Sequence, residues 1–469
     1  MRLGAGSIVK MRNGNQVKVI KASDRKVELG EGGQGYVYLV EDTATKKRYA
    51  LKWYKEQALD SLPKDTNGKP KIKAFHENLC RLSDKGAPHA NFLWPIDVTQ
   101  ILQGKCYGYI MPLREERFVE LTSVLNVDER FSDLRALCRA CENIADAFRI
   151  LHRHGYSYQD LNAGGIFIDL KTGDISVCDC DNVAPDGENI TGIKGFPGFM
   201  APEVLLGIAQ PSRGTDYHSL AVTLFYLTML GHPLEGANEC RFPVMNSTNG
   251  NKLYGSSAVF VYDPDNSSNR PQRGIHPNVI ALWDFYPKYI RDLFTKAFSH
   301  RALACSPDEA ASIRVKDMQW KAAFANLRNL VVSCPNCKRQ IYLDMENDQL
   351  VCKHCGKRIP RIGYLRLGND SIPVVSGRVL TIRQLVQDCS ADEIIGRFEE
   401  NPSRPGVVGL RNLSSQSWAI AVAGQQDQML APGAAIALCA NGQVRPGVQI
   451  DISHQALDGA FIKERAILV

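Results

Sequence analysis

Three charged residues in this chain have the types that a site for phosphoryl transfer requires. Lys52 ends the apolar segment Tyr49-Ala50-Leu51-Lys52, and two aspartates, Asp160 and Asp179, follow in polar segments nineteen residues apart. A lysine can bind phosphate oxygens, one aspartate can accept a hydroxyl proton, and another can hold Mg²⁺. Any one of them alone would usually be structural, so the neighbouring motifs must decide.

The segment before the lysine is rich in glycine and reads Leu29-Gly30-Glu31-Gly32-Gly33-Gln34-Gly35-Tyr36-Val37. It fits the pattern GxGxxGxV between stretches of β-type sequence. Glycines let a backbone approach phosphates and adopt angles that a Cβ would forbid. A turn that merely contains glycine would explain the match alone, but Lys52 on the next strand favours phosphate binding, with Val37 and Ala50 beside the adenine.

Further motifs follow in a fixed order. The first surrounds Asp160, the second surrounds Asp179, and the third ends in Ala-Pro-Glu at Glu203. Asp216 then opens a strongly apolar helix, and Arg314 is a candidate ion-pair partner for Glu203. The segments are Tyr158-Gln159-Asp160-Leu161-Asn162, Asp179-Cys180-Asp181-Asn182 and Gly195-Phe196-Pro197-Gly198-Phe199-Met200-Ala201-Pro202-Glu203.

Together these motifs, over about residues 20–330, resemble the protein kinase superfamily. The resemblance implies a bilobal α+β domain at 1–330, with an N-lobe at about 1–112 and a C-lobe at about 113–330. It also implies a catalytic Asp160, a loop-bracing Asp216, and Mg²⁺ or Mn²⁺ on Asp179. The residues implied to bind ATP are Leu29, Gly30, Gly32, Gly35, Val37, Ala50, Lys52, Glu77, Met111, Leu113 and Asp179.

The elements that must position the lysine follow it directly. The polar segment 55–70 is expected to be a loop. Residues 72–83 can then form a helix with an apolar side made of Phe75, Leu79 and Leu82. In the family a carboxylate on this helix holds the lysine, and Glu77 is the residue predicted to do so here.

The catalytic loop departs from the family. The usual His-Arg before the catalytic aspartate is Tyr158-Gln159, which leaves no obvious partner for a phosphate on Thr191 in the activation segment. The lysine two positions after the aspartate is Asn162, and Phe196 replaces a threonine. These joint changes suggest a remodelled site.

The metal-binding asparagine of the family is also missing, because Gly165 stands there. Two residues are candidates to replace it at Mg²⁺. Asn162 carries an amide oxygen in the same loop, and Asp181 would point the same way as Asp179 along an extended strand. We expect one well-held ion with Asn162 on it or on the γ-phosphate. The alternative is that Asn162 only braces the loop.

A narrower resemblance is to bacterial cytosolic kinases associated with PP2C-type phosphatases and von Willebrand-type, tellurium-resistance-linked proteins. It rests on FLWPIDV, YGYIMP, CDCDN and LTMLGHPLEG. It implies a Ser/Thr kinase in a signalling or stress-response system with such partners and a protein substrate. Two alternatives are a nucleotide-binding pseudokinase that serves as a scaffold and, less favoured by the Ala-Pro-Glu and Asp216 elements, a small-molecule kinase.

Two CxxC pairs predict a small zinc ribbon at 331–362. Cys334, Cys337, Cys352 and Cys355 would complete a closed tetrahedral site for structural Zn²⁺, with His354 as a bystander. Two redox disulfides are disfavoured because no thioredoxin-like context surrounds them. A further CxxC on the helix that begins near Ser132 or Asp133 is expected to pack in the core.

Residues 363–469 alternate β-type segments with turns and predict an all-β, sandwich-like domain for protein contacts. The segment from Gly409 to Ser414 and Trp418 faintly resembles forkhead-associated domains, which bind phosphothreonine. The candidate phosphate contacts are at Gly396-Arg397 and Ser403-Arg404.

Composition excludes several other classes of protein. The net charge is only +6 and is spread along the chain, which does not suggest binding to nucleic acid. The longest strongly apolar run, 219–230, is too short to span a bilayer. We expect a cytoplasmic protein without a signal peptide, in which some of the fourteen cysteines bind metal.

Overall fold

The computed structural model describes residues 2–24, 26–102, 106–304, 306–343, 351–359, 363–368, 370–386, 393–440, 442–445, 447–455 and 461–469. The chain divides into two compact units. Unit 1 contains Met1–Arg130, Asn143–Ile280 and Leu293–Met318. Unit 2 contains Phe131–Glu142, Ala281–Asp292 and Gln319–Val469.

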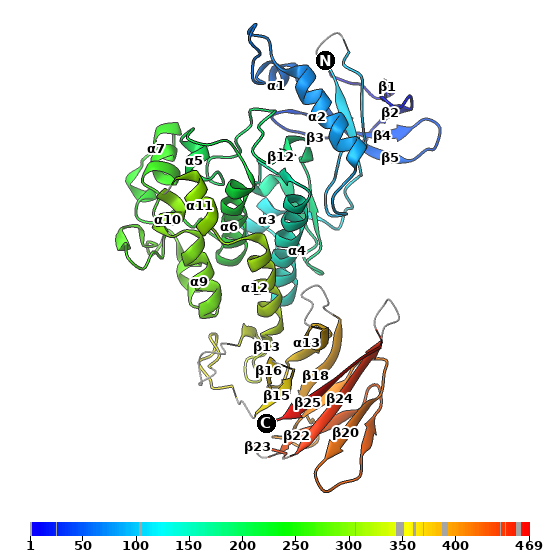
Figure 1. Cartoon of the computed structure of the whole chain (residues 1–469), viewed down its shortest axis with the longest axis vertical. Helices are drawn as coiled ribbons and strands as arrows, with labels where there is room; N and C mark the ends of the chain where they lie inside the picture. Colours follow the sequence, from blue (N-terminus) through cyan, green and yellow to red (C-terminus); the bar gives the residue numbers. More distant parts are fainter. Residues whose placement is uncertain are drawn as a thin grey trace. The chain divides into compact units, whose positions relative to one another are not determined.

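Unit 1 begins with an antiparallel sheet in the strand order β1-β2-β4-β5-β7-β6, with β3 also paired to β4 (Figure 1). Asn13 and Gly14 lie in the turn between β1 and β2, which pair as an antiparallel hairpin. Gly35 opens β4, where a Cβ would lie 2.6 Å from the Trp53 carbonyl oxygen, so only glycine fits. The strands are β1 (Ile8–Lys10), β2 (Gln16–Ile20), β3 (Glu28–Glu31), β4 (Gly35–Asp42), β5 (Arg48–Tyr54), β6 (Asp97–Val98) and β7 (Gly108–Met111).

Two helices connect β5 to β6. The segment expected to be a loop contains a short helix, α1 (Glu56–Asp60), whose Leu59 is buried. The predicted second helix is confirmed as α2 (Ile72–Lys85), and its buried face consists of Phe75, Asn78, Leu79 and Leu82. Three of these are the apolar residues that the sequence pattern had placed on one side.

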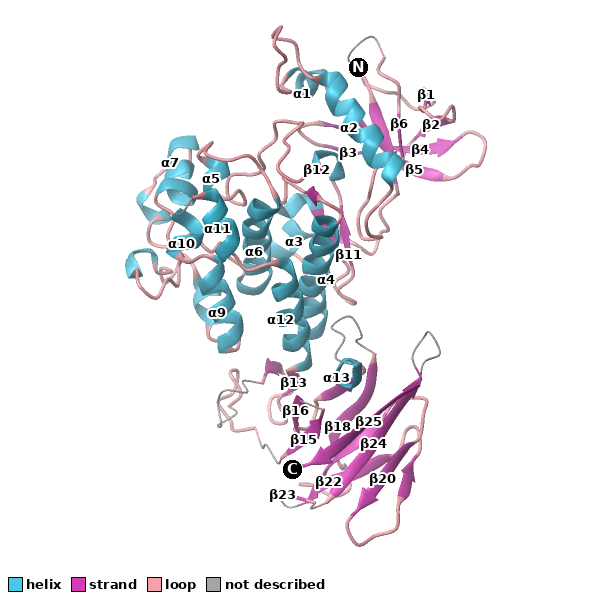
Figure 2. Cartoon of the chain, in the orientation of Figure 1, coloured by secondary structure: helices cyan, strands magenta, loops and turns pink. Residues whose placement is uncertain are grey.

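The second lobe of unit 1 is mainly helical and includes α3, α6 and α11 (Figure 2). Its central helix α6 is buried almost all round, as the apolar run predicts. The helices, four of which (α4, α8, α9 and α12) have residues in both units, are α3 (Leu121–Leu125), α4 (Leu134–Arg153), α5 (Pro202–Leu205), α6 (Arg213–Met229), α7 (Ser247–Asn251), α8 (Pro277–Trp283), α9 (Lys288–Ala297), α10 (His300–Ala304), α11 (Pro307–Ile313) and α12 (Asp317–Asn329).

Short strands and 3₁₀ turns carry the loops between these helices. The strands are β8 (Val119–Glu120), β9 (Tyr156–Ser157), β10 (Ile166–Ile168), β11 (Ile175–Val177) and β12 (Ala184–Pro185). The 3₁₀ turns at the site are η1 (Ala163–Gly165) and η2 (Cys180–Asn182). None of the helices in the described part of the chain is long and apolar enough to cross a membrane.

Unit 2 contains a small hairpin, β13 (Val331–Ser333) and β14 (Gln340–Tyr342), and a β-sandwich. Residues 344–350 and 360–362 of the predicted ribbon lie outside the described residues. The sandwich has one sheet in the order β16-β15-β25-β24-β20-β21 and another in the order β17-β18-β19-β22-β23. The all-β prediction for this region therefore agrees with the structure, apart from the short helix α13 (Arg383–Val386).

The core of the sandwich is built around Trp418, which is fully buried and donates its indole N–H to the Ser453 carbonyl oxygen. The strands are β15 (Tyr364–Leu367), β16 (Asp370–Pro373), β17 (Val379–Thr381), β18 (Ile394–Glu400), β19 (Val408–Asn412), β20 (Trp418–Val422), β21 (Gln428–Leu430), β22 (Ala435–Ala440), β23 (Gln443–Val444), β24 (Val448–Gln455) and β25 (Phe461–Leu468).

Candidate active site and metal site

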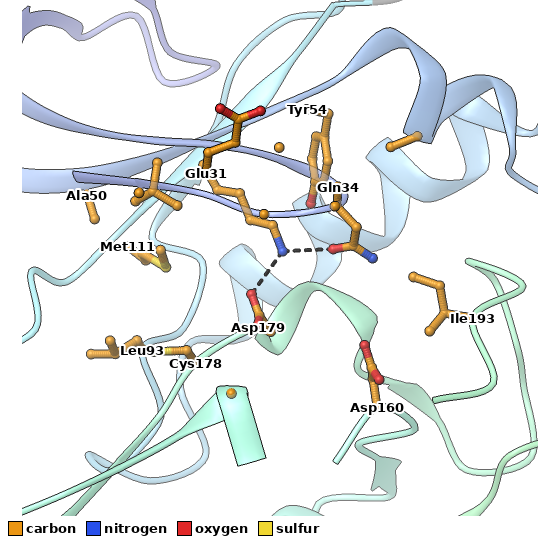
Figure 3. Close-up of a pocket in the computed structure, with 18 of the residues that line it drawn as sticks. Glu31, Gln34, Ala50, Tyr54, Leu93, Met111, Asp160, Cys178, Asp179 and Ile193 are labelled. Atoms are coloured by element: carbon orange, nitrogen blue, oxygen red, sulfur yellow. Dashed lines mark hydrogen bonds and ion pairs between the residues drawn. The ribbon is translucent and has the colours of Figure 1, made fainter. Parts of the chain in front are cut away.

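The two lobes of unit 1 line a pocket of about 990 Å³. Figure 3 shows Ala50, Leu93, Met111 and Cys178 together on one side and Asp160 on the other. One end thus suits a flat apolar group, and the other a polar, charged one. Among the predicted site residues, those that line the pocket are Leu29, Gly30, Gly32, Gly35, Val37, Ala50, Lys52, Met111, Leu113, Asp160, Asn162 and Asp179.

Lys52 lies at the polar end of the pocket and is buried. Its Nζ is 3.0 Å from Asp179 Oδ1 and 2.9 Å from Asp181 Oδ2, and it donates to Gln34 Oε1 at 2.9 Å. Figure 3 shows Gln34 and Asp179 joined to this amine. Burial opposes the charge, but the two aspartates outweigh it and raise the pKa of Lys52, so the amine stays cationic.

Glu77 does not contact Lys52, which corrects the sequence expectation. Its side chain is 63% exposed, and its carboxylate lies 3.8 Å from Lys73 Nζ. The physical reason is the register of α2, because successive residues are separated by about 100° around a helix. Asn78 takes the buried position and donates from Nδ2 to the Val183 carbonyl oxygen at 3.0 Å.

Asp181 also lies differently from the expectation. We assumed an extended strand, but Asp179 has left-handed backbone angles (φ 53°, ψ 39°) and a 3₁₀ turn follows it. The Asp181 carboxylate is therefore buried against Lys52 and the Tyr54 hydroxyl, which donates to Oδ2 at 2.5 Å. It is absent from the lining of the pocket, whereas the Asp179 side chain is 42% exposed and can still reach a metal ion.

Asp160 is held by two amides. Asn182 Nδ2 donates to its Oδ2 at 3.1 Å, and Asn162 Nδ2 lies 3.3 Å from its Oδ1. Burial raises the pKa of Asp160 to about 6, and the nearby charge of Asp179 adds to the rise. A carboxyl group with this pKa can accept a proton near neutral pH.

The loop before Asp160 is fixed from below by Asp216. Its carboxylate accepts the backbone N–H groups of Tyr158 at 2.6 Å and Gln159 at 3.1 Å. The Gln159 side chain donates to Ser157 Oγ and to the Glu188 carbonyl oxygen, in place of the charged contacts of an arginine. In the second lobe, Arg314 forms the expected ion pair with Glu203, in a bidentate geometry at 2.7 and 2.8 Å.

Asn162 braces the loop. Its Nδ2 donates to the Asp160 carbonyl oxygen at 2.9 Å and its Oδ1 accepts from the Gly164 N–H at 2.9 Å. Position 165 has little room, because a Cβ there would lie 3.2 Å from the Tyr158 hydroxyl, which itself donates to the Cys178 carbonyl oxygen. The loss of the asparagine at 165 thus goes together with the tyrosine at 158.

Sequence reasoning missed two groups of pocket residues. Gln34 and Tyr54 lie inside or beside motifs, but their types alone do not announce a contact with Lys52 or Asp181. Helix α1 was missed because its segment is polar. Helix α1, the two residues after it and the activation segment supply the lining residues Gln57, Ala58, Leu59, Ser61, Leu62, Thr191, Ile193 and Phe196.

The four predicted zinc ligands come together in unit 2. All four sulfur atoms lie within 4.8 Å of one another. Zn–S bonds of 2.3 Å in a tetrahedron separate sulfurs by about 3.8 Å. The Cys334–Cys355 and Cys337–Cys352 sulfur pairs are 3.8 and 3.7 Å apart, so the cluster fits Zn²⁺.

Both knuckles have the local geometry of a metal-binding turn. Lys338 and Gly356 follow the second cysteine of each pair with positive φ angles of 62° and 69°, and their N–H groups return to the carbonyls of Cys334 and Cys352. Hydrogen bonds from the Lys357 N–H and the Asn336 amide lower the pKa of Cys355 to about 6, which favours the thiolate that a metal requires.

Comparison with known proteins agrees with this geometry. Residues 23–253 match the protein kinase domain family. Serine/threonine-protein kinase stk11 of Xenopus laevis is 27% identical over 215 residues, which are 45% of this chain and 48% of that protein. The human protein STK11 is 27% identical over 215 residues, with 45% and 47% covered. Rhodopsin kinase GRK1 of Rattus norvegicus is 27% identical over 218 residues, with 45% and 36% covered.

This chain spans about half the length of the first two relatives. The match covers the segments that form the pocket, from the glycine-rich strand to the activation segment. Its identity is low, but the pocket contains the lysine and the two aspartates that phosphoryl transfer requires. The chain therefore contains a protein kinase domain with serine/threonine kinase homologues.

Proposed function

We propose that this chain is an ATP-dependent Ser/Thr protein kinase that transfers the γ-phosphoryl group to a protein hydroxyl. The observation that supports this most directly is the meeting of Lys52, Asp160 and Asp179 around one pocket with an apolar end. These are the three groups that phosphoryl transfer needs for phosphate binding, hydroxyl orientation and metal binding.

Each residue has a distinct task in the proposed reaction. Val37, Ala50 and Met111 would contact the adenine, and the glycine-rich segment and Lys52 the phosphates. Asp160, held by Asn182 and Asn162, would accept a hydrogen bond from the incoming hydroxyl and orient it toward the phosphorus. Asp179 would hold Mg²⁺ or Mn²⁺, which would neutralise phosphate charge when bound.

We further propose that one well-held metal ion suffices. Mg²⁺ keeps several waters and can be bound by one carboxylate plus phosphates. Asp179 offers that carboxylate, and Gly165 offers no ligand. The Asn162 amide is engaged within the loop, although its Oδ1 could turn toward an ion or the γ-phosphate. Two fully occupied ions in a nucleotide-bound structure, with Asn162 turned away from both, would end this proposal.

The test of the kinase proposal uses the full chain with Mg²⁺, γ-labelled ATP and candidate protein substrates. Asp160→Asn should lower transfer by about a hundredfold or more. The matched control is Asp128→Asn, because Asp128 is an exposed aspartate outside the pocket. Equal transfer by wild type, Asp160→Asn, Lys52→Ala and Asp179→Ala would reject the proposal.

A nucleotide-binding pseudokinase scaffold is the second candidate. The observation that favours it is that position 165, where ordinary kinases have a metal-binding asparagine, is a glycine close to the Tyr158 hydroxyl. In this case the same assay would give no labelled product for any substrate, while a separate binding measurement would show that the chain binds nucleotide. The zinc and β modules would then recruit partners.

The narrower resemblance supports a more specific setting. We propose a cytoplasmic bacterial signalling or stress-response system with a PP2C-type phosphatase and a von Willebrand-type protein. The sandwich would bind a protein partner. Arg397 and Arg404 are exposed and would be the phosphate contacts if the domain is forkhead-associated-like. Phosphothreonine peptides and their unphosphorylated forms would distinguish the two modes of binding.

A further inference from the structure

Asp181 is the second residue of the tight turn that follows Asp179, and both of its oxygens are occupied. We propose that Asp181 is the positioning residue for Lys52, replacing the carboxylate that α2 was expected to supply. This inference rests on the proposed function, because the task of Lys52 is to bind phosphates. It assigns Asp181 to the lysine and not to the metal ion.

The contacts of Asp181 are those of a buried counter-ion for Lys52. Its side chain is fully buried, and its Oδ1 and Oδ2 lie 3.0 and 2.9 Å from Lys52 Nζ. The Tyr54 hydroxyl donates to Oδ2 at 2.5 Å, which fixes the carboxylate from the side of β5. A buried charge is stable only when paired and hydrogen-bonded, and Asp181 satisfies both conditions.

Helix α2 has no carboxylate in the position to compete. Glu77 is turned to solvent beside Lys73. The buried neighbour in that register is Asn78, whose amide is used on the Val183 carbonyl oxygen and whose Oδ1 accepts from Arg81. The orientation of Lys52 is therefore set by β5 and by the turn after Asp179, not by a charge on α2.

The turn also explains how two aspartates can share one lysine. The left-handed angles of Asp179 reverse the chain, so that Asp179 and Asp181 reach the same amine at 3.0 and 2.9 Å. The Asp179 side chain is 42% exposed, whereas the Asp181 side chain is fully buried. When Asp179 turns to a metal ion, Asp181 remains to hold the lysine in place.

The first arm of the test measures the pairing without nucleotide. Lys52→Met should lower the thermal midpoint, because it leaves Asp181 buried without its cation. Adding Asp181→Asn should restore part of that loss. Adding Glu77→Gln, which removes the carboxylate of α2, should restore none of the lost thermal midpoint. Adding Asp179→Asn should restore less than adding Asp181→Asn, because Asp179 is partly exposed.

The second arm measures what the pairing does for phosphate binding. Asp181→Asn should weaken binding of Mg²⁺·ADP by about tenfold or more. Its affinity for adenosine should change by less than about twofold. A tenfold loss of ADP affinity equals about 1.4 kcal/mol of binding free energy, and this loss should come from the contact between Lys52 and the phosphates, which adenosine lacks. Glu77→Gln should bind both ligands as the wild type does, and extra Mg²⁺ should not rescue Asp181→Asn.

The outcomes separate this inference from the proposed function. Coupling of Lys52 to Glu77, or equal loss of adenosine and ADP binding in Asp181→Asn, would overturn the assignment of Asp181. Rescue by Mg²⁺ would make Asp181 a metal ligand and also overturn it. A wild-type protein that binds no nucleotide would instead overturn the proposed function, even if the first arm showed the coupling.

Discussion

The partners of a carboxylate that accepts a proton must fix its orientation but must not prevent it from becoming protonated. In the proposed reaction Asp160 would meet this condition, because its partners, Asn182 and Asn162, are neutral amides. They fix its direction, while burial and the charge of Asp179 raise its pKa to about 6. The residue thus titrates close to neutral pH.

The pH dependence of transfer follows from that pKa. Asp160 must be ionised to accept the proton, so kcat/KM should fall as the pH drops through about 6. A profile measured from pH 5 to 8 at subsaturating ATP reports the free enzyme. A profile that is flat down to pH 5 would contradict this assignment. Nucleotide binding measured over the same pH range without protein substrate separates this fall from any effect of the titration of ATP on binding.

Phosphorylation of the activation segment should have little influence. Thr191 is only 4% exposed, its hydroxyl accepts from the Ile193 N–H, and Gln159 is engaged with backbone and serine partners. Thr191→Ala should therefore keep most of the transfer activity. A loss of about a hundredfold or more would show that another basic group reads a phosphate there. Mass spectrometry of the active protein checks whether Thr191 is modified.

At the residue scale, sequence reasoning correctly placed at the pocket the residues whose chemistry the proposed reaction requires, Lys52, Asp160 and Asp179. It failed for Glu77 and Asp181, because the choice between them depends on helix register and on one left-handed residue. Asp179 adopts φ 53° without being glycine, which no sequence pattern announces. A one-residue difference on α2 was enough to turn Glu77 to solvent and Asn78 to the core.

At the scale of elements, three helices meet at a buried histidine. His152 of α4 lies 3.1 Å from Asp216 of α6 and 2.7 Å from Asp317 at the start of α12. Burial disfavours the charged ring, but the hydrogen bonds and charges of both aspartates outweigh it and raise the pKa of His152. Through His152 the cluster connects Asp216, which holds the loop before Asp160, to α4 and α12.

The raised pKa of His152 predicts a pH-dependent contribution to stability. The folded state binds the proton more tightly, so the contribution is complete below the ordinary pKa of about 6.5 and is lost as the pH rises through the folded value. The deficit of His152→Gln in the free energy of unfolding should therefore shrink with rising pH. Urea unfolding between pH 5.5 and 9 measures it.

The control for this measurement lies two residues away. His154 is exposed just after the end of α4, and the hydrogen bond described for its ring is the one with the Ile150 carbonyl oxygen. His154→Gln should show only a small deficit in the free energy of unfolding, because its ring is exposed. A His152→Gln deficit that grows above pH 7 would mean that the buried ring is neutral.

Elements with strong apolar periodicity were predictable and polar ones were not. The pattern indicated α2, the long α4 and the buried α6, because each has an apolar face or is buried on all sides. The start of α4 was also readable, since Asp133 accepts from the Ala136 N–H. Helix α1 is short and polar outside Leu59, so the sequence alone gave no reason to place it beside the pocket.

At the scale of the whole molecule, the small core around the four cysteines includes residues that lie outside the segment 334–355. This core contains Cys334, Cys352 and Val375, and Phe285 packs against it. Residues 281–292 and 131–142 accordingly belong to unit 2. The sequence division at residue 330 could not show this, because segments distant in sequence complete the core.

The zinc site offers the final prediction. Metal analysis should find one Zn²⁺ per chain, and Cys334→Ser with Cys352→Ser should remove it. Zinc–ligand free energy is also folding free energy, on the order of 10 kcal/mol for such sites. The double variant should therefore unfold locally around residues 331–359, detected by limited proteolysis, and the exposure of Phe285 should increase. Nucleotide binding in unit 1 should persist, because no zinc ligand lines that pocket. Cys240→Ser, at an exposed cysteine outside the cluster, is the matched control and should keep both zinc and protease resistance. A wild-type protein that is fully folded without zinc would contradict the prediction, and loss of nucleotide binding in the double variant would show that the two units do not fold independently.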